Sequence, residues 1–320
     1  MNTQPPLFNP DKPPIPSPAE QVDQSIEPIQ IIKDTPGLTL QNIIPEEAAL
    51  EVLKHYEPRA MHIGRFLASL EEINPQGKRV SRSEIGRQLG VNEAMAEGTF
   101  NAMRFMLMID TRTHLTAFGS LVKARSPYLD NQGLLWFLHY LLASNAQLVL
   151  WSNLFNFVFA QKEEVSNQEI LEAFRVLQGR WSDQTLSKKL RMEANAILKT
   201  YTEALFSPLG LLVKEDKALY SGYWNTAIIP APVWLACILV YRDRYYPGAV
   251  SLEIPLLINA HYSPGRILRQ KEIYLRQALD ELHNSGLITV ETRSGLDQVR
   301  FKREVTWFSV ISRYLSGAAA

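Results

Sequence analysis

Residues 265–303 read GRILRQKEIYLRQALDELHNSGLITVETRSGLDQVRFKR, and this stretch decides the expected fold. Apolar side chains recur in its first half at helical spacing, which predicts a long helix over residues 265–285 with one buried face. The second half alternates around a Ser294-Gly295 turn and predicts a two-stranded hairpin. A short helix is expected just before, over residues 251–259. The order helix, turn, helix and hairpin is that of a winged helix-turn-helix unit.

The same order is expected twice more along the chain. In the first copy, Ser81 and Glu84 have the spacing of a capping box, which marks the start of a helix. A longer helix over 92–108 and a hairpin over 109–116 then follow. The second copy is expected as helices over 166–179 and 182–206, an apolar step at 209–213 and a turn at 215–217.

Two uncharged, aromatic-rich stretches, 134–142 and 148–159, separate the first two copies and predict a central helical core. The expected fold is therefore mainly α with small β-hairpin wings, in which tandem winged helix-turn-helix units surround this core. Four regions are expected: a disordered, proline-rich acidic tail over 1–45, an N-terminal winged-helix-like domain over 46–126, a central helical domain with a candidate second winged-helix unit over 127–245, and a C-terminal winged-helix domain over 246–320.

Proline and charge are concentrated at the N-terminal end. Ten of the 19 prolines lie in residues 1–45, so this tail cannot form a long helix or a sheet ladder. A first helix is expected from Pro45 to Pro58, and a second over residues 60–73. Residues 1–57 contain three basic and nine acidic residues, a balance of −6, which leaves +6 for the rest of the neutral chain. Such an asymmetry is typical of some nucleic-acid-binding proteins.

The setting expected from the sequence is cytoplasmic and reducing. Cys237 is the only cysteine and lies among apolar residues, so no intrachain disulfide can form. The first residues have neither a basic region nor an apolar stretch typical of a secretory signal. Residues 134–161 and 218–241 carry no charge, but they contain asparagines, a histidine or prolines that a membrane span would leave unsatisfied. No membrane association is therefore expected.

No catalytic motif stands out. The sequence has no phosphate-binding loop, dinucleotide fingerprint or nucleophile elbow. Its six histidines do not pair at metal-ligand spacing, and one cysteine cannot build a usual zinc site. We therefore expect neither an enzyme nor a resident metal or cofactor.

Nucleic-acid binding is the function that the basic residues of the third copy favour. Residues 259–303 contain eight basic and five acidic residues, a balance of +3. Arginine and glutamine read base edges, tyrosine reaches phosphate, and basic residues on a wing contact the backbone. An ordinary solvated helix or a protein-binding winged helix is the alternative. The candidate DNA-binding residues are Arg266, Arg269, Gln270, Tyr274, Arg276, Gln277, Arg293, Arg300, Lys302 and Arg303.

The other two copies supply weaker candidates. Helical spacing turns Glu93, Glu97, Phe100, Asn101 and Arg104 outward in the first copy, and its two acids would repel phosphate. This copy is therefore expected to contact DNA through its flanks or to bind protein. The secondary basic candidates of the two copies are Arg79, Arg82, Arg87, Arg104, Arg112, Lys188 and Lys199.

Several short stretches resemble a family of prokaryotic proteins known only as a domain of unknown function. They are LGVNEAM at 89–95, LTAFG at 115–119, YLDNQGLLWFLHY at 128–140 and WSNLFN at 151–156. The resemblance covers about residues 56–245. Members are encoded near DNA phosphorothioation genes of the Dnd type, including a sulfur-transfer protein similar to phosphoadenosine-phosphosulfate reductases. The His-Glu-Thr-Phe opening usual in the family is replaced here by YEPRAMH at 56–62.

The resemblance implies a setting but no catalytic residues. Phosphorothioation replaces a phosphate oxygen by sulfur, so it needs factors that locate and hold DNA. The first hypothesis is a DNA-binding accessory component of a phosphorothioate modification or anti-phage defence system. The alternatives are an adaptor that docks a sulfur-transfer or other DNA-modification protein through its winged helices, and a winged-helix transcriptional regulator, which would require sequence specificity.

Overall fold

The computed structural model describes residues 48–73, 81–174, 182–216, 219–222, 224, 226–293 and 296–317. This part of the chain is mainly helical and contains two three-stranded antiparallel sheets. Within it, none of the helices has both the length and the apolar character that crossing a bilayer requires. The tail over 1–45 lies outside the described residues.

The described part of the N-terminal region contains four helices and a non-helical segment, residues 48–57, which we call the strap. The helix expected from Pro45 to Pro58 is therefore wrong over residues 48–57. The strap follows an irregular path instead, because Leu50, Val52 and Leu53 are buried against other elements rather than along one helical face. The helices are α3 (Ala60–Ile73), α4 (Arg82–Leu89), α5 (Glu93–Phe105) and α6 (Ala117–Arg125).

Local signals explain how these helices begin and end. The Ser81 side chain accepts from the Glu84 backbone N–H at the start of α4, which is one half of the expected capping box, whereas the Glu84 carboxylate accepts from Arg87 and Gln88. Gly90 ends this helix in a left-handed conformation. The hairpin expected over 109–116 is reduced to a single antiparallel bridge between Ile109 and Leu115. The chain turns back immediately because α6 begins at Ala117.

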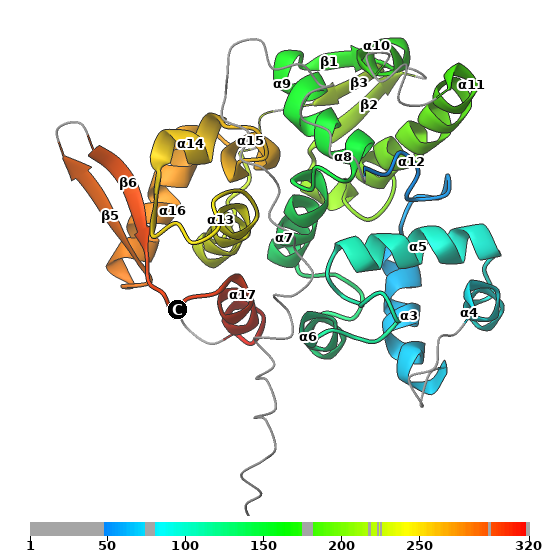
Figure 1. Ribbon diagram of the computed structural model, residues 1–320, viewed down its shortest axis with the longest axis horizontal. Coiled ribbons are helices and arrows are strands. Elements are labelled where there is room, and N and C mark those ends of the chain that lie inside the picture. Colours follow the sequence, from blue (N-terminus) through cyan, green and yellow to red (C-terminus); the bar gives the residue numbers. More distant parts are fainter. Residues whose placement is uncertain are drawn as a thin grey trace, which may run out of the picture.

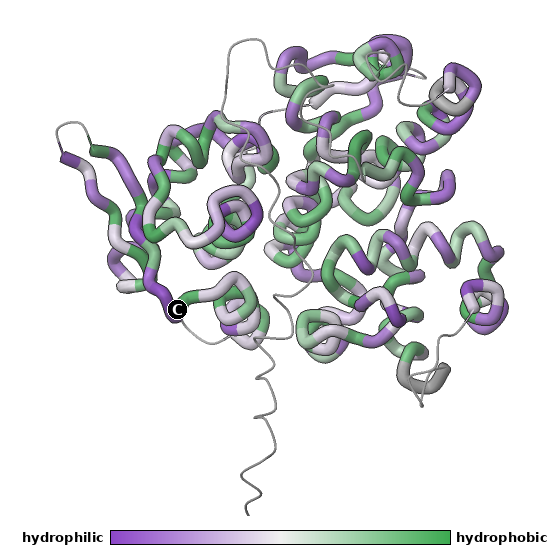
Figure 2. Tube along the Cα trace, in the orientation of Figure 1, coloured by the Kyte–Doolittle hydropathy of each residue, from purple (hydrophilic) through white to green (hydrophobic). Residues whose placement is uncertain are grey.

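The aromatic-rich stretches form the centre of the molecule, as the sequence predicts. Trp136, Phe137, Trp151 and Phe155 are almost fully buried, and α7 is one of the most hydrophobic segments in view (Figure 2). His139, also fully buried, contacts Tyr201 through Nδ1 at 2.7 Å and the Ile267 carbonyl through Nε2 at 3.0 Å. The central elements are α7 (Gln132–Ala143), α8 (Val149–Asn153), the π-helical turn η2 (Leu154–Val158) and α9 (Phe159–Gln161).

The second copy contains the first sheet, with strand order β1-β3-β2. The strand just before its first helix pairs with the second strand of the hairpin. These elements lie above the N-terminal helices in Figure 1. They are β1 (Glu164–Ser166), α10 (Asn167–Ala173), α11 (Asp183–Thr185), η4 (Leu186–Leu190), α12 (Arg191–Thr202), η5 (Ser207–Leu209), β2 (Leu212–Asp216) and β3 (Leu219–Gly222).

The third copy repeats this connectivity, with strand order β4-β6-β5, and forms the left side of Figure 1. Its hairpin follows the sequence prediction: Ile288 pairs with Phe301 and Arg293 with Leu296. The helix α13 (Ala231–Tyr245) packs against α7, α16 and α17 (Trp307–Leu315), which joins this copy to the core. The remaining elements are β4 (Ser251–Glu253), α14 (Ile254–Asn259), α15 (Pro264–Leu268), α16 (Glu272–Asn284), β5 (Ile288–Arg293) and β6 (Leu296–Phe301).

Two expectations for the third copy are corrected. Residues 251–253 form a strand rather than the start of a helix, because they pair with β6. The long helix expected over 265–285 is interrupted between α15 and α16, where Arg269 has a left-handed backbone with φ 51°. The helix that follows the turn therefore begins at Glu272, and Arg269 and Gln270 lie outside it.

Candidate interaction surface

The helices α5, α12 and α16 occupy a similar place in the three copies: each is the last long helix before the bridge or hairpin. In a helix-turn-helix protein this position carries the recognition surface. Two of the three helices are covered by the strap. On α5, a Cβ added to Gly98 would lie 2.0 Å from the Leu53 carbonyl oxygen, and the Asn101 side chain donates to the Val52 carbonyl at 3.0 Å. The outward face of α5 is thus filled by the chain itself.

The strap also contacts α12 through a buried carboxylate. Glu193 is 1% exposed, and its Oε1 accepts from the backbone N–H groups of Val52 and Leu53 at 2.7 and 2.6 Å. Burial raises the pKa of Glu193 to about 7, despite the two N–H groups that favour the ionised form. Lys189 adds an ion pair with Glu51 at 3.1 Å. Both helices are therefore parts of an internal interface.

The strap does not cover the outward side of α16, and its residues there are exposed among the described residues. Four of its side chains form an exposed stripe opposite the buried Leu275 and Leu279, and we call this stripe the α16 face. It consists of Ile273, Gln277, Asp280 and Asn284. Ile273 is 57% exposed, and Glu281 is exposed beside the stripe. The α16 face therefore combines one large apolar side chain with amides and acidic groups.

Arg276 on the flank of the α16 face is held by acidic partners. Its Nη2 lies 2.6 Å and its Nη1 3.2 Å from the two carboxylate oxygens of Asp297 on β6, and its Nε lies 2.6 Å from Glu272. Asp297 and Glu272 together raise the pKa of Arg276 further. The bidentate pair with Asp297 joins α16 to the hairpin, so this guanidinium is not free to bind phosphate.

Arg269 and Gln270 are wrongly predicted to contact DNA, since they are only 2% and 1% exposed. The Arg269 guanidinium donates to the Phe159 and Gly222 carbonyls, the latter at 2.6 Å, and burial lowers its pKa to about 10. Arg266 is half-buried, and its Nε donates to the Asn156 carbonyl at 3.1 Å. Both arginines connect the third copy to the central elements, and Arg269 also connects it to β3 of the second copy, rather than line a surface.

The other candidates of the third copy lie at its surface. Gln277, Arg293, Arg300, Lys302 and Arg303 are exposed, and Tyr274 is half-buried. The Arg300 Nε lies 3.2 Å from a Glu291 carboxylate oxygen, which balances its charge. Arg293 ends β5, and Lys302 and Arg303 directly follow β6, so the exposed cations gather along the hairpin rather than on the α16 face.

The secondary candidates are mostly paired or dispersed. Arg79 lies outside the described residues. Arg82 pairs with Glu97, and Arg87 pairs with Glu84. Arg104 is half-buried, and burial together with nearby Arg82 lowers its pKa. The remaining three, Arg112, Lys188 and Lys199, are exposed.

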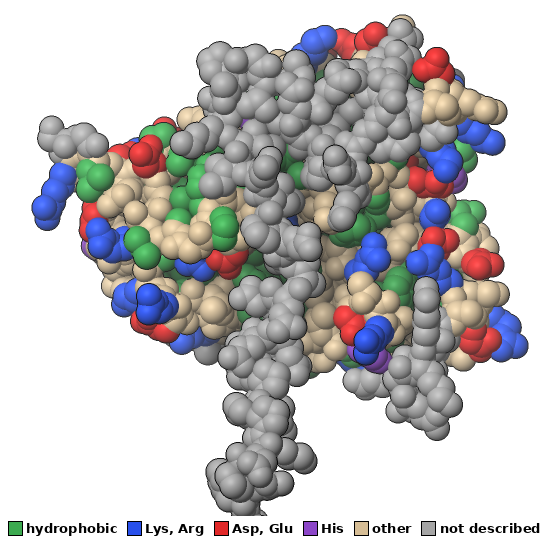
Figure 3. Space-filling view, viewed as in Figure 1, with side chains coloured by type: hydrophobic (Ala, Val, Ile, Leu, Met, Phe, Trp, Pro, Cys, Tyr) green, Lys and Arg blue, Asp and Glu red, His purple; other side chains and the backbone are tan. Residues whose placement is uncertain are grey.

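The predictions for two side chains of α5 are also corrected. Phe100 and Asn101 are 7% and 9% exposed, so neither points outward as helical spacing suggests. The strap covers Asn101, whose side chain donates to the Val52 carbonyl, whereas the Phe100 ring lies beside Arg82 of α4. On the face seen in Figure 3, basic and acidic side chains alternate among the coloured atoms. Among the described residues, no group of three or more His, Cys, Asp or Glu side chains could hold a metal ion.

A model of the family described as "Protein of unknown function (DUF4007)" matches residues 87–314. The chain belongs to the DUF4007 family. This confirms the expectation of a domain of unknown function. Two solved structures share the fold of this DUF4007 protein: the SspB crystal structure, at 17% identity, and the magnesium ion-bound SspB crystal structure, at 16%. Each match has a TM-score of 0.67 and covers 85% of this chain and 90% of the other. No curated protein sequence is significantly similar.

Proposed function

We propose that this DUF4007 protein is an accessory component of a DNA phosphorothioation system that docks a protein partner through the α16 face. The observation that carries the proposal is the chemistry of that face: exposed Ile273, Gln277 and Asp280, with the adjacent Arg276 held by Asp297 and Glu272. A helix that enters the major groove approaches phosphates on both sides, and Asp280 and Glu281 would oppose this.

The connectivity supports the inference that the second and third copies are winged-helix units. In each, a strand precedes a run of helices and a hairpin, and the hairpin's second strand pairs back with the first strand. The third copy alone leaves the outward side of the long helix before its hairpin uncovered by the strap. The first copy lacks a full hairpin, and we assign it to the scaffold.

The partner surface that would complement the α16 face is apolar at its centre and basic at its edge. Exposed Ile273 needs an apolar pocket, and Asp280 and Glu281 need cations or N–H donors. The link to phosphorothioation rests on the resemblance to proteins encoded beside such genes. The sulfur-transfer protein of that gene set is the partner to test first.

The test is co-expression of the full chain with that sulfur-transfer protein, followed by size-exclusion chromatography and titration of the purified partners. Ile273→Asp should weaken the complex at least about tenfold, since a central apolar anchor of an interface contributes about 2 kcal/mol or more. Met61→Asp on α3, which also replaces a half-exposed apolar side chain, is the matched control and should leave affinity unchanged. No complex with the wild-type chain, or equal affinity for Ile273→Asp, would refute the proposal.

A second candidate function is DNA contact through the third hairpin. Arg293, Lys302 and Arg303 are exposed there and take part in none of the ion pairs found in the described residues. Duplex DNA with and without a phosphorothioate should then bind with a steep salt dependence. Charge reversal of these three residues should abolish that binding. Undiminished binding of the reversed variant would remove this candidate.

A further inference from the structure

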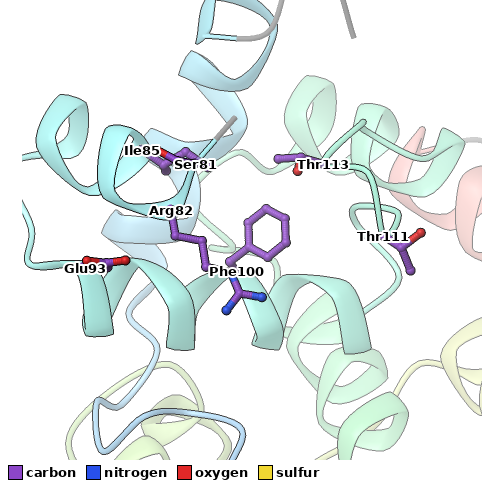
Figure 4. Close-up of a pocket in the computed structure, with 7 residues that line it drawn as sticks. All are labelled: Ser81, Arg82, Ile85, Glu93, Phe100, Thr111 and Thr113. Atoms are coloured by element: carbon purple, nitrogen blue, oxygen red, sulfur yellow. The ribbon is translucent and has the colours of Figure 1, made fainter. Parts of the chain in front are cut away.

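A cavity of about 470 Å³ lies between α4, α5 and the turn that follows α5. Its volume is within the range of small-molecule sites. In the close-up, the Phe100 ring lies between Arg82 on one side and the two threonines of the turn on the other (Figure 4). The described residues that line the cavity are Ser81, Arg82, Ile85, Glu93, Phe100, Thr111 and Thr113.

The lining offers flat apolar contacts together with hydrogen-bonding groups. Phe100 supplies an aromatic ring, and the Arg82 guanidinium carbon lies 6.0 Å from the ring centre. Hydroxyls of Thr111 and Thr113 and the Glu93 carboxylate add donors and acceptors. A flat ligand can stack on either an aromatic ring or a guanidinium plane. The cavity is therefore suited to a planar molecule with polar edges.

The charge of the lining argues against a free anion. Arg82 already pairs with Glu97, and Glu93 contributes a second carboxylate. These acids balance the guanidinium, so phosphate alone would gain little inside the cavity. Positive charge lies outside it instead: Arg112 is exposed in the turn between the two threonines, and half-buried Arg104 follows Phe100 by one helical turn. The balance favours a neutral ring inside and a negative group near the mouth.

The turn that carries the threonines has an unusual backbone. Thr113 is 5% exposed and has φ 79°, a left-handed conformation that a β-branched residue rarely adopts. Asp110 holds the turn by accepting from the backbone N–H groups of Arg112 and His114 at 2.8 and 2.9 Å. Such strained backbone is concentrated at ligand-binding sites, where the surrounding contacts hold it in place despite its energetic cost. Here it fixes Thr113 against the cavity.

We infer that this cavity of the N-terminal copy binds a nucleobase of an unpaired nucleotide, with its phosphate toward Arg104 and Arg112. An unpaired base presents both a flat face and a Watson–Crick edge, and proteins bind such bases by stacking together with hydrogen bonds. The site lies on α4 and α5, and the inference is independent of the α16 face.

The experiment is calorimetric titration of the full chain with the four 5′-deoxymononucleotides and with two short single-stranded oligonucleotides. The oligonucleotides differ only at one central position, which carries a base in one and is abasic in the other. We expect at least one mononucleotide to bind, and the abasic oligonucleotide to bind about tenfold more weakly, as loss of base stacking predicts. Equal affinity for the two oligonucleotides, or no binding of any probe, overturns the inference.

Two variants locate the site. Thr111→Trp fills the cavity mouth and should remove the base-dependent part of binding. Ser120→Trp, at an exposed position of α6 away from the cavity, is its control and should bind like the wild type. Equal losses in both tryptophan variants contradict the assignment. Should Thr111→Trp unfold, Glu93→Gln replaces it: this exposed isosteric change must alter the preference among the four mononucleotides, and an unaltered preference overturns the inference.

Discussion

The Glu193 carboxylate on α12 accepts a hydrogen bond from the Leu53 backbone N–H of the strap at 2.6 Å, with the whole side chain buried. The pKa of Glu193 is raised to about 7, with burial as the largest cause and nearby Glu51 as a further one. The two N–H groups act in the opposite direction. A carboxyl group that tends to stay protonated near neutral pH thus joins the strap to the second copy.

The first prediction is that Glu193 makes stability fall as pH rises. The unfolded carboxyl loses its proton near its ordinary pKa of 4.5, whereas the folded group keeps its proton up to about 7. Folding therefore takes up a proton between these values, and the stabilisation present below pH 4.5 is lost as pH rises through 7. The loss is of the order of 3 kcal/mol. Urea unfolding from pH 4.5 to 8 measures it.

Glu193→Gln is the control for that series. Its amide oxygen can accept from the same two N–H groups, but it does not titrate. The free energy of unfolding of the wild type, relative to this variant, should therefore decrease between pH 5 and pH 8. A constant difference would mean that Glu193 is ionised throughout this range in the folded state.

The second prediction concerns the close approach of the strap to α5. Gly98→Ala would place a Cβ 2.0 Å from the Leu53 carbonyl oxygen, a backbone atom that cannot move without shifting the strap. Alanine favours a helix interior over glycine by about 1 kcal/mol, but overpacking of this kind costs about 1–3 kcal/mol or more. We expect net destabilisation in thermal unfolding. Ala94→Gly, at an exposed position of the same helix, measures the difference in helix propensity alone. A Gly98→Ala variant that is more stable than the wild type would show that the strap shifts to make room for the added Cβ.

The third prediction separates a structural arginine from a surface arginine. Arg269→Met leaves the Phe159 and Gly222 carbonyls without their buried donor, which should cost about 3 kcal/mol of unfolding free energy. Arg293→Met at the exposed end of β5 should change stability by less than about 0.5 kcal/mol. Chemical denaturation of both variants is the measurement. Similar stabilities would mean that Arg269 does not hold the third copy to the second.

In the third copy, the helical spacing of the apolar residues correctly predicts which of them are buried. Leu275, Ala278, Leu279 and Leu282 are all buried, and β5 pairs with β6 as far as Arg293 and Leu296. Helical spacing does not reveal that α16 begins only at Glu272. Arg269 fits the helical spacing of the apolar residues, but its left-handed backbone interrupts the helix. Ser263, which caps α15, and Pro264 at its first position are the local signals of a separate short helix.

The candidate surface is less predictable because it depends on contacts between distant residues. The strap and α12 are about 140 residues apart where Leu53 meets Glu193. Helical spacing alone therefore predicts that Phe100 and Asn101 face outward. The strap covers Asn101, and Arg82 of α4 lies beside the Phe100 ring. Gly98 inside a helix is the one local signal of this contact, since glycine often marks a close backbone approach.

The last prediction tests why the α16 face lacks a free cation. Arg276 pairs with Asp297 and Glu272, but its side chain is 37% exposed, so solvent reduces the value of these pairs. A double-mutant cycle with Arg276→Ala and Asp297→Ala should therefore give a coupling energy of only about 0.5–1 kcal/mol, measured by urea unfolding.

Asp297→Asn combined with Glu272→Gln removes both acids and leaves Arg276 available beside Gln277. If pairing with the two acids is what keeps the Arg276 guanidinium from contacting phosphate, the double variant should bind duplex DNA more tightly than the wild type at low salt. The salt dependence of its affinity should then be steeper by about one phosphate contact. An unchanged slope would mean that the shape of the α16 face, rather than the pairing of Arg276, keeps DNA away from it.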